Sequence, residues 1–317
     1  MEMNEPHQVM ENCTSVTEFI LLGISDLPEL QIPLFVIFLV IYLSTLLGNA
    51  TIIVLTRVDI YLQTPMYFFL THLSILDFCN STVTVPKMLV GLLSERKTIS
   101  FTGCIAQFSC FIFFACSECL LLSVMAYDRH VAICHPLRYS VIMNGRVCTN
   151  LAVFSWGGGF LYSMLHTCAT LRLSFCGPVL IRHFFCDVPP LFALSCISPF
   201  INVILVFISG SIVGLGSFII TLLSYTRIIS SVLRIRSMLG KRKAFSTCAS
   251  HLTVVTFFYG AIIFIYFRPA TSYALVDGRL VSMIYTVITP LLNPLVYTLR
   301  NQEIKGACNR LLRYMSH

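Results

Sequence analysis

The sequence predicts an all-α membrane protein, a bundle of seven transmembrane helices followed by a short amphipathic eighth helix. Hydrophobic residues make up 56% of the 317 residues and charged residues only 11%. This is too little charge for the surface of a soluble protein. The charges are also unevenly spaced, and they leave seven stretches with at most one Asp, Glu, Lys or Arg, at 30–56, 60–86, 99–127, 147–171, 188–226, 244–267 and 280–299.

Each stretch is long enough for a helix that crosses the bilayer. Roughly 20 apolar residues cover the hydrocarbon core of about 30 Å. Backbone groups in lipid must form hydrogen bonds within their own segment, so helices are expected. The fifth stretch is too long for one crossing, and Pro189, Pro190 and Pro199 in its first part predict a loop that leads into a helix near Phe200.

The basic residues predict the orientation. No Lys or Arg precedes Arg57, and the leader is acidic. With the N-terminus outside, two thirds of the 21 lysines and arginines fall on inner segments, as the positive-inside rule requires. The basic excess therefore indicates membrane topology and gives no reason to expect nucleic acid as a partner. Asn12-Cys13-Thr14 fits the glycosylation pattern on the outer side.

These observations divide the chain into an extracellular N-terminal segment (1–29), a seven-transmembrane domain (30–299) and a cytoplasmic tail (300–317). No cleavable signal peptide is evident at the start, so the first span is expected to act as a signal anchor. In the tail, Ile304, Cys308, Leu311 and Leu312 lie at helical spacing. They predict an eighth helix on the membrane surface.

The third span carries one continuous stripe from the outer to the inner surface. Steps of three and four place its members on one helix face. From Cys104 to Arg129 the stripe covers about 37 Å at 1.5 Å per residue, slightly more than the hydrocarbon core. A helix of this kind could transmit a structural change from the outer to the inner side of the membrane. The stripe consists of Cys104, Phe108, Phe111, Ala115, Glu118, Leu122, Met125 and Arg129.

Two acids, Asp77 and Glu118, lie near the middle of spans two and three. An ionised group there costs several kcal/mol, about 2.5–3.5 on insertion scales, unless it is paired or hydrated. With Asn49, Ser123 and Asn293 they could hold a sodium ion or a water network. The alternative is two protonated carboxyls in a polar seam.

The inner end of span three and the last span contain candidate moving parts. Asp128 and Arg129 are adjacent, and they could form an ion pair that breaks when helices move. Interfacial snorkelling is the alternative explanation. In the last span, Pro290 and Pro294 remove backbone hydrogen bonds, which predicts a kink and a hinge, and Asn293 could satisfy a freed carbonyl.

Four cysteines belong to the outer side, Cys104 at the end of span three and Cys176, Cys186 and Cys196 in a loop. They allow three pairings. The oxidising side favours disulfides. Linking Cys104 to Cys186 would draw the loop over the bundle, and Cys176 would then pair with Cys196. A metal site that includes His183 is the less favoured alternative.

Several runs match a known family. They are GN at 48–49, PMYFFL at 65–70, MAYDRHVAIC at 125–134, SY at 224–225, KAFSTCASHL at 243–252 and PLLNP at 290–294. With these runs the chain resembles the rhodopsin-like G-protein-coupled receptors, and within them the vertebrate odorant receptors, from about residue 17 to 313. The three loop cysteines and the short outer connection around Asp277 are similar to the terrestrial class.

The resemblance implies a function and an activation mechanism. A receptor of this kind binds a small volatile odorant and activates the heterotrimeric stimulatory olfactory G protein, which raises cyclic AMP. It resides in the plasma membrane, including the cilia of olfactory neurons, and is not an enzyme. Arg129, Tyr225 and Tyr297 would form the switch, and Asp77 and Glu118 would line the ion site. Span six lacks the Trp and internal Pro of the wider receptor pattern, which leaves Gly260 as a candidate bending point.

The family's ligand-facing positions map onto apolar or neutral side chains. They are Phe108, Phe111, Ile112, Ala115, Cys116, Ser209, Tyr259, Ile262, Ile263, Tyr266, Met283 and Thr286. The spacing of one helix face is also shared by Tyr259, Ile262, Ile263 and Tyr266. No position carries an acid or a base, so a small, neutral, mostly apolar ligand is expected. Core packing is the alternative role for each single residue.

Two other functions compete with the receptor. A cation transporter would use Asp77 and Glu118, but the chain shows no internal repeat of the kind many transporters have. An intramembrane hydrolase would need a nucleophile with a nearby base or metal-ligand spacing, and neither stands out. No resident cofactor is expected apart from the sodium ion near Asp77 and Glu118.

Overall fold

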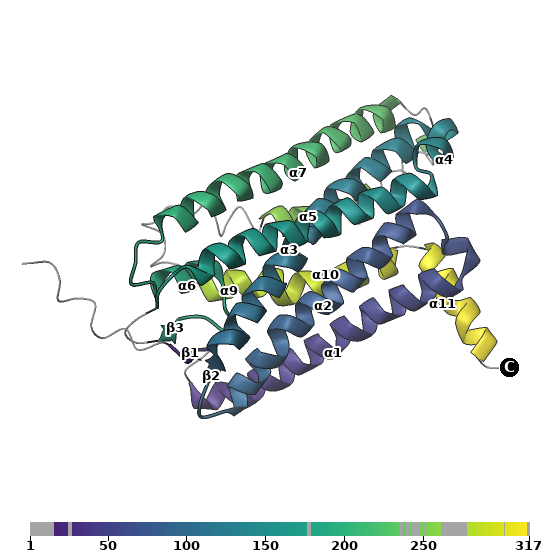
Figure 1. Cartoon of the computed structure of the whole chain (residues 1–317). Coiled ribbons are helices and arrows are strands. Elements are labelled where there is room, and N and C mark those ends of the chain that lie inside the picture. Colours follow the sequence, from purple (N-terminus) through teal and green to yellow (C-terminus); the bar gives the residue numbers. More distant parts are fainter. Residues whose placement is uncertain are drawn as a thin grey trace, which may run out of the picture.

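The computed structural model shows an elongated bundle of long helices that run side by side, with small elements at both ends (Figure 1). It describes residues 16–24, 27–175, 179–234, 237–238, 241, 248–249, 251–260, 278–300 and 302–315. The long helices are α1 (Pro28–Val58), α2 (Pro65–Leu93), α3 (Phe101–Cys134), α5 (Gly145–Leu171) and α7 (Phe200–Arg234). Within the described residues, 251–260 are helical as well.

The last span is one helical path with an irregular centre. It consists of α9 (Gly278–Met283), the π-helical η4 (Ile284–Ile288) and α10 (Thr289–Arg300). The π-turn ends two residues before Pro290, which lacks the backbone N–H that a regular helix would use. These segments confirm the predicted seven-helix bundle. The tail helix α11 (Gln302–Met315) confirms the predicted eighth helix, with Ile304 and Ala307 buried.

Local sequence explains where the helices begin. Proline opens α1 and α2, because its missing N–H is not needed in the first turn. Ser100 caps α3 by accepting from the Gly103 N–H at 3.1 Å, and Asn144 caps α5 by accepting from Val147. The helix α7 begins at Phe200, as predicted, after the short α6 (Val188–Ala193) in the preceding loop.

The outer surface of the bundle is apolar, as a lipid-facing surface requires. Leu47 of α1, Phe160 of α5 and Ile212 of α7 are all exposed. Among the described residues, α1, α3 and α7 are each long and apolar enough to cross a membrane. Most polar residues of α2, among them Asp77 and Asn80, are instead buried within the bundle, where they escape lipid.

A three-stranded sheet closes one end of the bundle. The order is β2 (Thr98–Ser100), β1 (Glu18–Leu21) and β3 (Leu180–Ile181), with β1 antiparallel to β2 and parallel to β3. At the opposite end lie α4 (Tyr139–Ile142) and α11, near the C-terminus (Figure 1). Two further turns, η1 (Ile60–Leu62) and η2 (Pro136–Arg138), belong to the connections α1–α2 and α3–α4.

Candidate functional site

A disulfide fixes the loop above the bundle. Cys104 of α3 and Cys186 are bonded, with their Cα atoms 5.6 Å apart, which confirms the predicted pairing. Gln107, one turn further along α3, accepts from the Cys186 N–H at 3.0 Å and donates to the Val83 carbonyl of α2. Cys196 is also disulfide-bonded. Cys176 lies outside the described residues, so the second pairing stays a prediction.

The segment around Cys186, residues 183–188, forms a lid over the outer end of α3. Phe185 packs against Phe111, with the ring centroids 4.9 Å apart, and Phe111 also contacts Tyr285 of η4. Asp187 is 3% exposed and accepts from the Val188 N–H and from the Tyr285 hydroxyl. Burial raises the pKa of Asp187, while these two hydrogen bonds act in the opposite direction.

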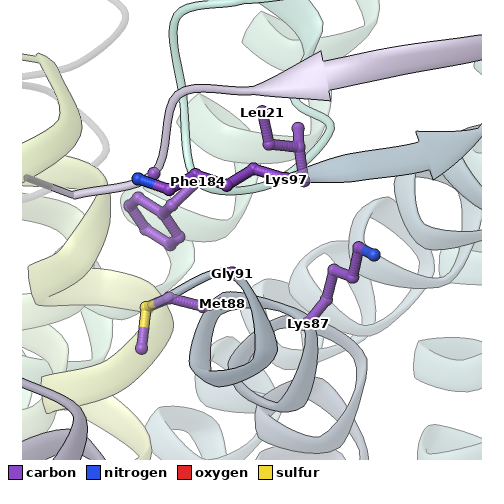
Figure 2. Close-up of a pocket in the computed structure, with 7 residues that line it drawn as sticks. Leu21, Lys87, Met88, Gly91, Lys97 and Phe184 are labelled. Atoms are coloured by element: carbon purple, nitrogen blue, oxygen red, sulfur yellow. The ribbon is translucent and has the colours of Figure 1, made fainter. Parts of the chain in front are cut away.

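The N-terminal strand β1 ties the lid together. Its backbone bonds to Lys97 on one side and to Val179 and Ile181 on the other, and Phe19 is fully buried against Phe101 and Phe175. Figure 2 shows the small cavity that remains below β1, with Phe184 and Met88 facing each other across it. At about 10 Å³ this cavity has room for roughly one water molecule. It is too small for an organic ligand.

The predicted ligand-facing residues of α3 lie directly beneath the lid. Phe108, Phe111, Ile112 and Cys116 are buried, and Ala115 is partly buried on the same face. Deeper in the bundle, the Tyr259 hydroxyl is 3.9 Å from the Cys119 sulfur, and its ring packs edge-on against Phe218 of α7. These contacts join α3, α7 and the helix at 251–260.

Three other predicted ligand-facing residues make contacts of their own. Thr286 donates to the Ser282 carbonyl, and Met283 packs against the buried cluster beneath the lid. The Ser209 hydroxyl is 2.9 Å from Nε2 of His166, so it links α7 to α5. Ile262, Ile263 and Tyr266 lie outside the described residues.

The predicted ion-site residues form one polar cluster at the centre of the bundle. Asn293 donates to Asp77 at 2.9 Å. Asp77 and Asn49 are fully buried, and Glu118, which neighbours Asp77, is 3% exposed. Ser123, in contrast, donates to the Leu120 carbonyl of its own helix. The cluster therefore connects α1, α2, α3 and α10.

Asn49 corrects one detail of the hinge prediction. Pro294 lacks the N–H that would bond to the Pro290 carbonyl, and Asn49 of α1 donates to this carbonyl at 3.2 Å. Asn293, to which the sequence assigned a freed carbonyl, is turned to Asp77 instead. Gly48 lies beside this contact, because a Cβ there would be 3.0 Å from the Pro294 side chain. The Gly48-Asn49 pair thus holds α1 against the proline of α10.

Four buried oxygens of this cluster have no hydrogen-bond donor in the described part of the chain: Oδ1 of Asn49, Asp77 and Asn293, and Oε1 of Glu118. Carboxylate and amide oxygens are the ligands of hard cations, and they equally accept from water. The donor set therefore fits the expected sodium ion or water network. No group of three His, Cys, Asp or Glu side chains in the described residues could hold a metal ion.

The predicted switch lies at the opposite end from the lid. Arg129 forms an ion pair with Asp128 at 3.2 Å, and Asp128 also accepts from the Tyr139 hydroxyl of α4 at 2.8 Å. The Tyr225 hydroxyl is 2.7 Å from Nδ1 of His251, with the two rings stacked. This contact joins α7 to the helix at 251–260. Tyr297 of α10 is buried, and its hydroxyl has no hydrogen-bond partner among the described residues.

Comparison with known proteins identifies the family. A family model described as olfactory receptor matches residues 38–314. The chain belongs to the olfactory receptor family. It is 52% identical to human olfactory receptor 10A7 over 96% of both chains, and 50% identical to mouse olfactory receptor 8U3 over 95% of this chain and 94% of that one. It is also 52% identical to chicken olfactory receptor-like protein COR5 over 95% and 96%. The resemblance seen in the motifs is therefore confirmed.

Membership has direct consequences. The protein is an olfactory receptor, a multi-pass protein of the plasma membrane, and its family is a class of receptors and not of enzymes. The fold agrees with this assignment.

The structure of this olfactory receptor adds residues that the sequence did not single out. Phe185, Asp187 and Tyr285 belong to the lid, and Tyr139 and His251 complete the inner contacts. Two of these features are visible in the sequence, since Phe184-Phe185 is an aromatic pair beside a half-cystine and His251 belongs to the same run, 243–252, as Cys248. Asn12 lies outside the described residues.

Proposed function

We propose that this olfactory receptor binds a small, neutral, mostly apolar odorant beneath the lid and activates a stimulatory olfactory-type G protein that raises cyclic AMP. One observation carries the proposal. The buried face of α3 runs from the disulfide at Cys104, past Phe108 and Phe111, to the ion pair at Arg129. A single rigid element thereby joins the proposed ligand site to the proposed switch.

The proposed ligand site consists of the residues mapped above on α3, with Tyr259, Met283 and Thr286, together with Ser209 and the undescribed Ile262, Ile263 and Tyr266. Burial of the odorant would contribute roughly 25 cal/mol per Å² of apolar area, and one or two hydrogen bonds would orient it. Tyr259 is the best placed to respond, because it already contacts both α3 and α7.

Activation then requires that the odorant bind two states differently. In the present state, Tyr225 and His251 hold α7 to the helix at 251–260. In the activated state this helix moves outward at its inner end, and Arg129, Tyr225 and Tyr297 rearrange to admit the G protein. The kink at Asn293 and Pro294 allows the last span to follow, and sodium or water in the cluster around Asp77 and Glu118 stabilises the resting arrangement.

We further propose that the lid end is extracellular and the α4–α11 end cytoplasmic. The excess of basic residues toward the second end supports this orientation. It would place residues 1–29 and the glycosylation site at Asn12 outside, residues 30–299 in the membrane, and 300–317 in the cytoplasm. The ciliary membrane of olfactory neurons is the proposed location.

An agonist screen with a cyclic AMP readout in transfected cells tests the function. With an agonist in hand, Arg129→Ala should abolish the cyclic AMP response while surface expression remains largely intact. Arg146→Ala, at an exposed arginine of α5, serves as the control and should signal normally. Retained signalling by Arg129→Ala would refute the assigned switch.

A cation transporter is the second candidate, favoured by the four unsatisfied oxygens at Asn49, Asp77, Glu118 and Asn293. Transport would need this cluster to open to each side of the membrane in turn. Cation flux into liposomes that contain the purified protein separates the two functions, since a receptor should give no flux above that of empty liposomes.

A further inference from the structure

A second cavity opens at the end of the bundle opposite the lid. It has a volume of about 700 Å³ and lies between the inner ends of α2 and α5, bordered by the α1–α2 connection and by α4. This volume is within the range of small-molecule sites, roughly 300–1,000 Å³. We call this cavity the α2–α5 groove. The proposed odorant site is at the other end of the molecule, so a ligand of the groove would be a different molecule.

The lining of the α2–α5 groove combines a cation with hydrogen-bond donors. Arg57 is exposed at its edge and forms no ion pair within the described residues, and none of the lining residues is acidic. Nδ1 of His72 accepts a hydrogen bond from the indole N–H of Trp156, with 3.2 Å between the two nitrogens. A neutral ring in this arrangement carries its proton on Nε2, as a donor. The polar part of the groove is therefore suited to an anion.

The apolar part of the lining consists of Leu62, Pro65, Phe68, Met143 and Cys148, and it lies beside uncharged polar side chains such as Gln63 and Ser140. Phe68 is partly buried and Met143 is buried in the groove wall. Val141 of α4 and Val153 of α5 are highly exposed. A ligand with a charged head and a hydrocarbon tail would match both parts, whereas a soluble anion would use only the first.

We propose that the α2–α5 groove binds an anionic phospholipid of the cytoplasmic leaflet, with its phosphate at Arg57 and an acyl chain along Phe68 and Met143. That leaflet carries the anionic lipids of the plasma membrane. The inference rests on the proposed orientation of this end toward the cytoplasm. Tyr139 also lines the groove, so a bound lipid contacts the residue whose hydroxyl bonds to Asp128.

The chain offers a built-in probe, because Trp156 is its only tryptophan and is bonded to His72 in the groove wall. The purified full-length receptor is reconstituted into phosphatidylcholine vesicles that contain increasing amounts of dansyl-labelled phosphatidylserine. Energy transfer from Trp156 should saturate with this lipid. Unlabelled phosphatidylserine should reverse the transfer, and inorganic phosphate should not.

Matched variants locate the site. Arg57→Gln should raise the phosphatidylserine content needed for half-maximal transfer about fivefold, the usual contribution of one arginine near an anionic surface. Arg57→Lys should restore most of the binding. Arg146→Gln removes the same charge from α5 outside the groove, and its titration should follow the wild type. Circular dichroism confirms that each variant is folded.

Equal titrations of Arg57→Gln and Arg146→Gln would overturn the site. Equal transfer to dansyl-labelled phosphatidylcholine would overturn the preference for an anionic lipid, and reversal by inorganic phosphate would assign the groove to a soluble anion. The measurement uses neither odorant nor G protein. A negative lipid titration would therefore not contradict the proposed receptor function. Likewise, a receptor that failed to raise cyclic AMP could still bind the lipid.

Discussion

Three consecutive glycines in α5 have different surroundings. A Cβ at Gly159 would lie 2.8 Å from the Phe113 carbonyl oxygen and 2.9 Å from the Ser117 nitrogen, both backbone atoms of α3. A Cβ at Gly158 would meet only the flexible end of Leu120, and one at Gly157 would meet nothing within 4 Å. The close contact of α5 with α3, the helix that joins the lid to the proposed switch, therefore depends on Gly159.

Gly159→Ala should force α3 and α5 apart, because backbone atoms cannot give way as a side chain can. Overpacking of this kind costs about 1–3 kcal/mol. Thermal unfolding of the purified receptor measures the loss, and surface expression should fall with it. Gly157→Ala is the matched control, and it should be neutral or stabilising by up to about 1 kcal/mol. Equal stabilities of the two variants would contradict the assigned packing.

Asn49 links α1 to α10 through its hydrogen bond to the Pro290 carbonyl. Asn49→Ala removes the donor to the Pro290 carbonyl, and a buried carbonyl without a partner costs about 1–3 kcal/mol. The variant should unfold at a lower temperature than the wild type. Thr51→Ala, two residues away, removes an exposed hydroxyl that bonds only to its own helix, and should unfold like the wild type. If both variants behaved alike, the assigned link between α1 and α10 would be wrong.

At the scale of elements, the contact between α7 and the helix at 251–260 is the one that the proposed activation changes. His251→Phe keeps a flat ring against Tyr225 but removes the nitrogen that bonds its hydroxyl. Loss of about 1 kcal/mol from the resting state corresponds to about a fivefold shift toward the active one. Basal cyclic AMP should rise accordingly.

The control for this experiment is Thr253→Val, on the same helix, where the hydroxyl bonds only to the Ala249 carbonyl of its own helix. It should leave basal cyclic AMP unchanged at equal surface expression. A basal level in His251→Phe that is equal to or below that of the wild type would mean that the bond does not stabilise the resting state.

The lid should respond to pH through Asp187. Burial raises the pKa of this carboxyl above its ordinary value, so the closed lid binds the proton more tightly than an open lid. Closure is therefore most favourable at low pH, where Asp187 is protonated, and it weakens as the pH rises through the raised pKa. Hydrogen exchange at the amides of residues 183–188, at mildly acidic and neutral pH, measures this change.

His183 is a second ionisable side chain of the same loop, so a variant is needed to isolate Asp187. Asp187→Asn keeps an oxygen acceptor but cannot ionise, and the part of the pH dependence that it removes belongs to the carboxyl. Protection that increases with pH in the wild type would have the wrong sign for this explanation.

For the whole molecule, patterns within short stretches of sequence predicted those structural features that depend on nearby residues. The stretches with at most one charge predicted the helices, the prolines near 189–199 predicted the late start of α7, and the outer cysteines predicted the bond from Cys104 to Cys186. The helix faces of α3 followed from spacing alone. These features depend on neighbours within a few turns or on the small set of oxidisable partners.

Contacts between distant segments could not be predicted in this way. The strand β1 pairs with residues about 80 and 160 positions away, and nothing in its four residues specifies these partners. Asn49 and Asn293 are equally able to bond a free carbonyl, and only the approach of α1 at Gly48 decides between them. Ser209 likewise bonds to His166 because α5 and α7 are adjacent.

The central claim is that an odorant beneath the lid moves the inner end of the sixth span, whose described residues 248–249 and 251–260 are helical. Fluorophores on non-canonical amino acids at positions 149 and 249 would report the distance between α5 and this helix, without interference from the 14 cysteines. Saturating agonist should lengthen this distance, and Arg129→Ala should uncouple the movement from cyclic AMP. An unchanged distance in a receptor whose cyclic AMP response is intact would contradict the claim.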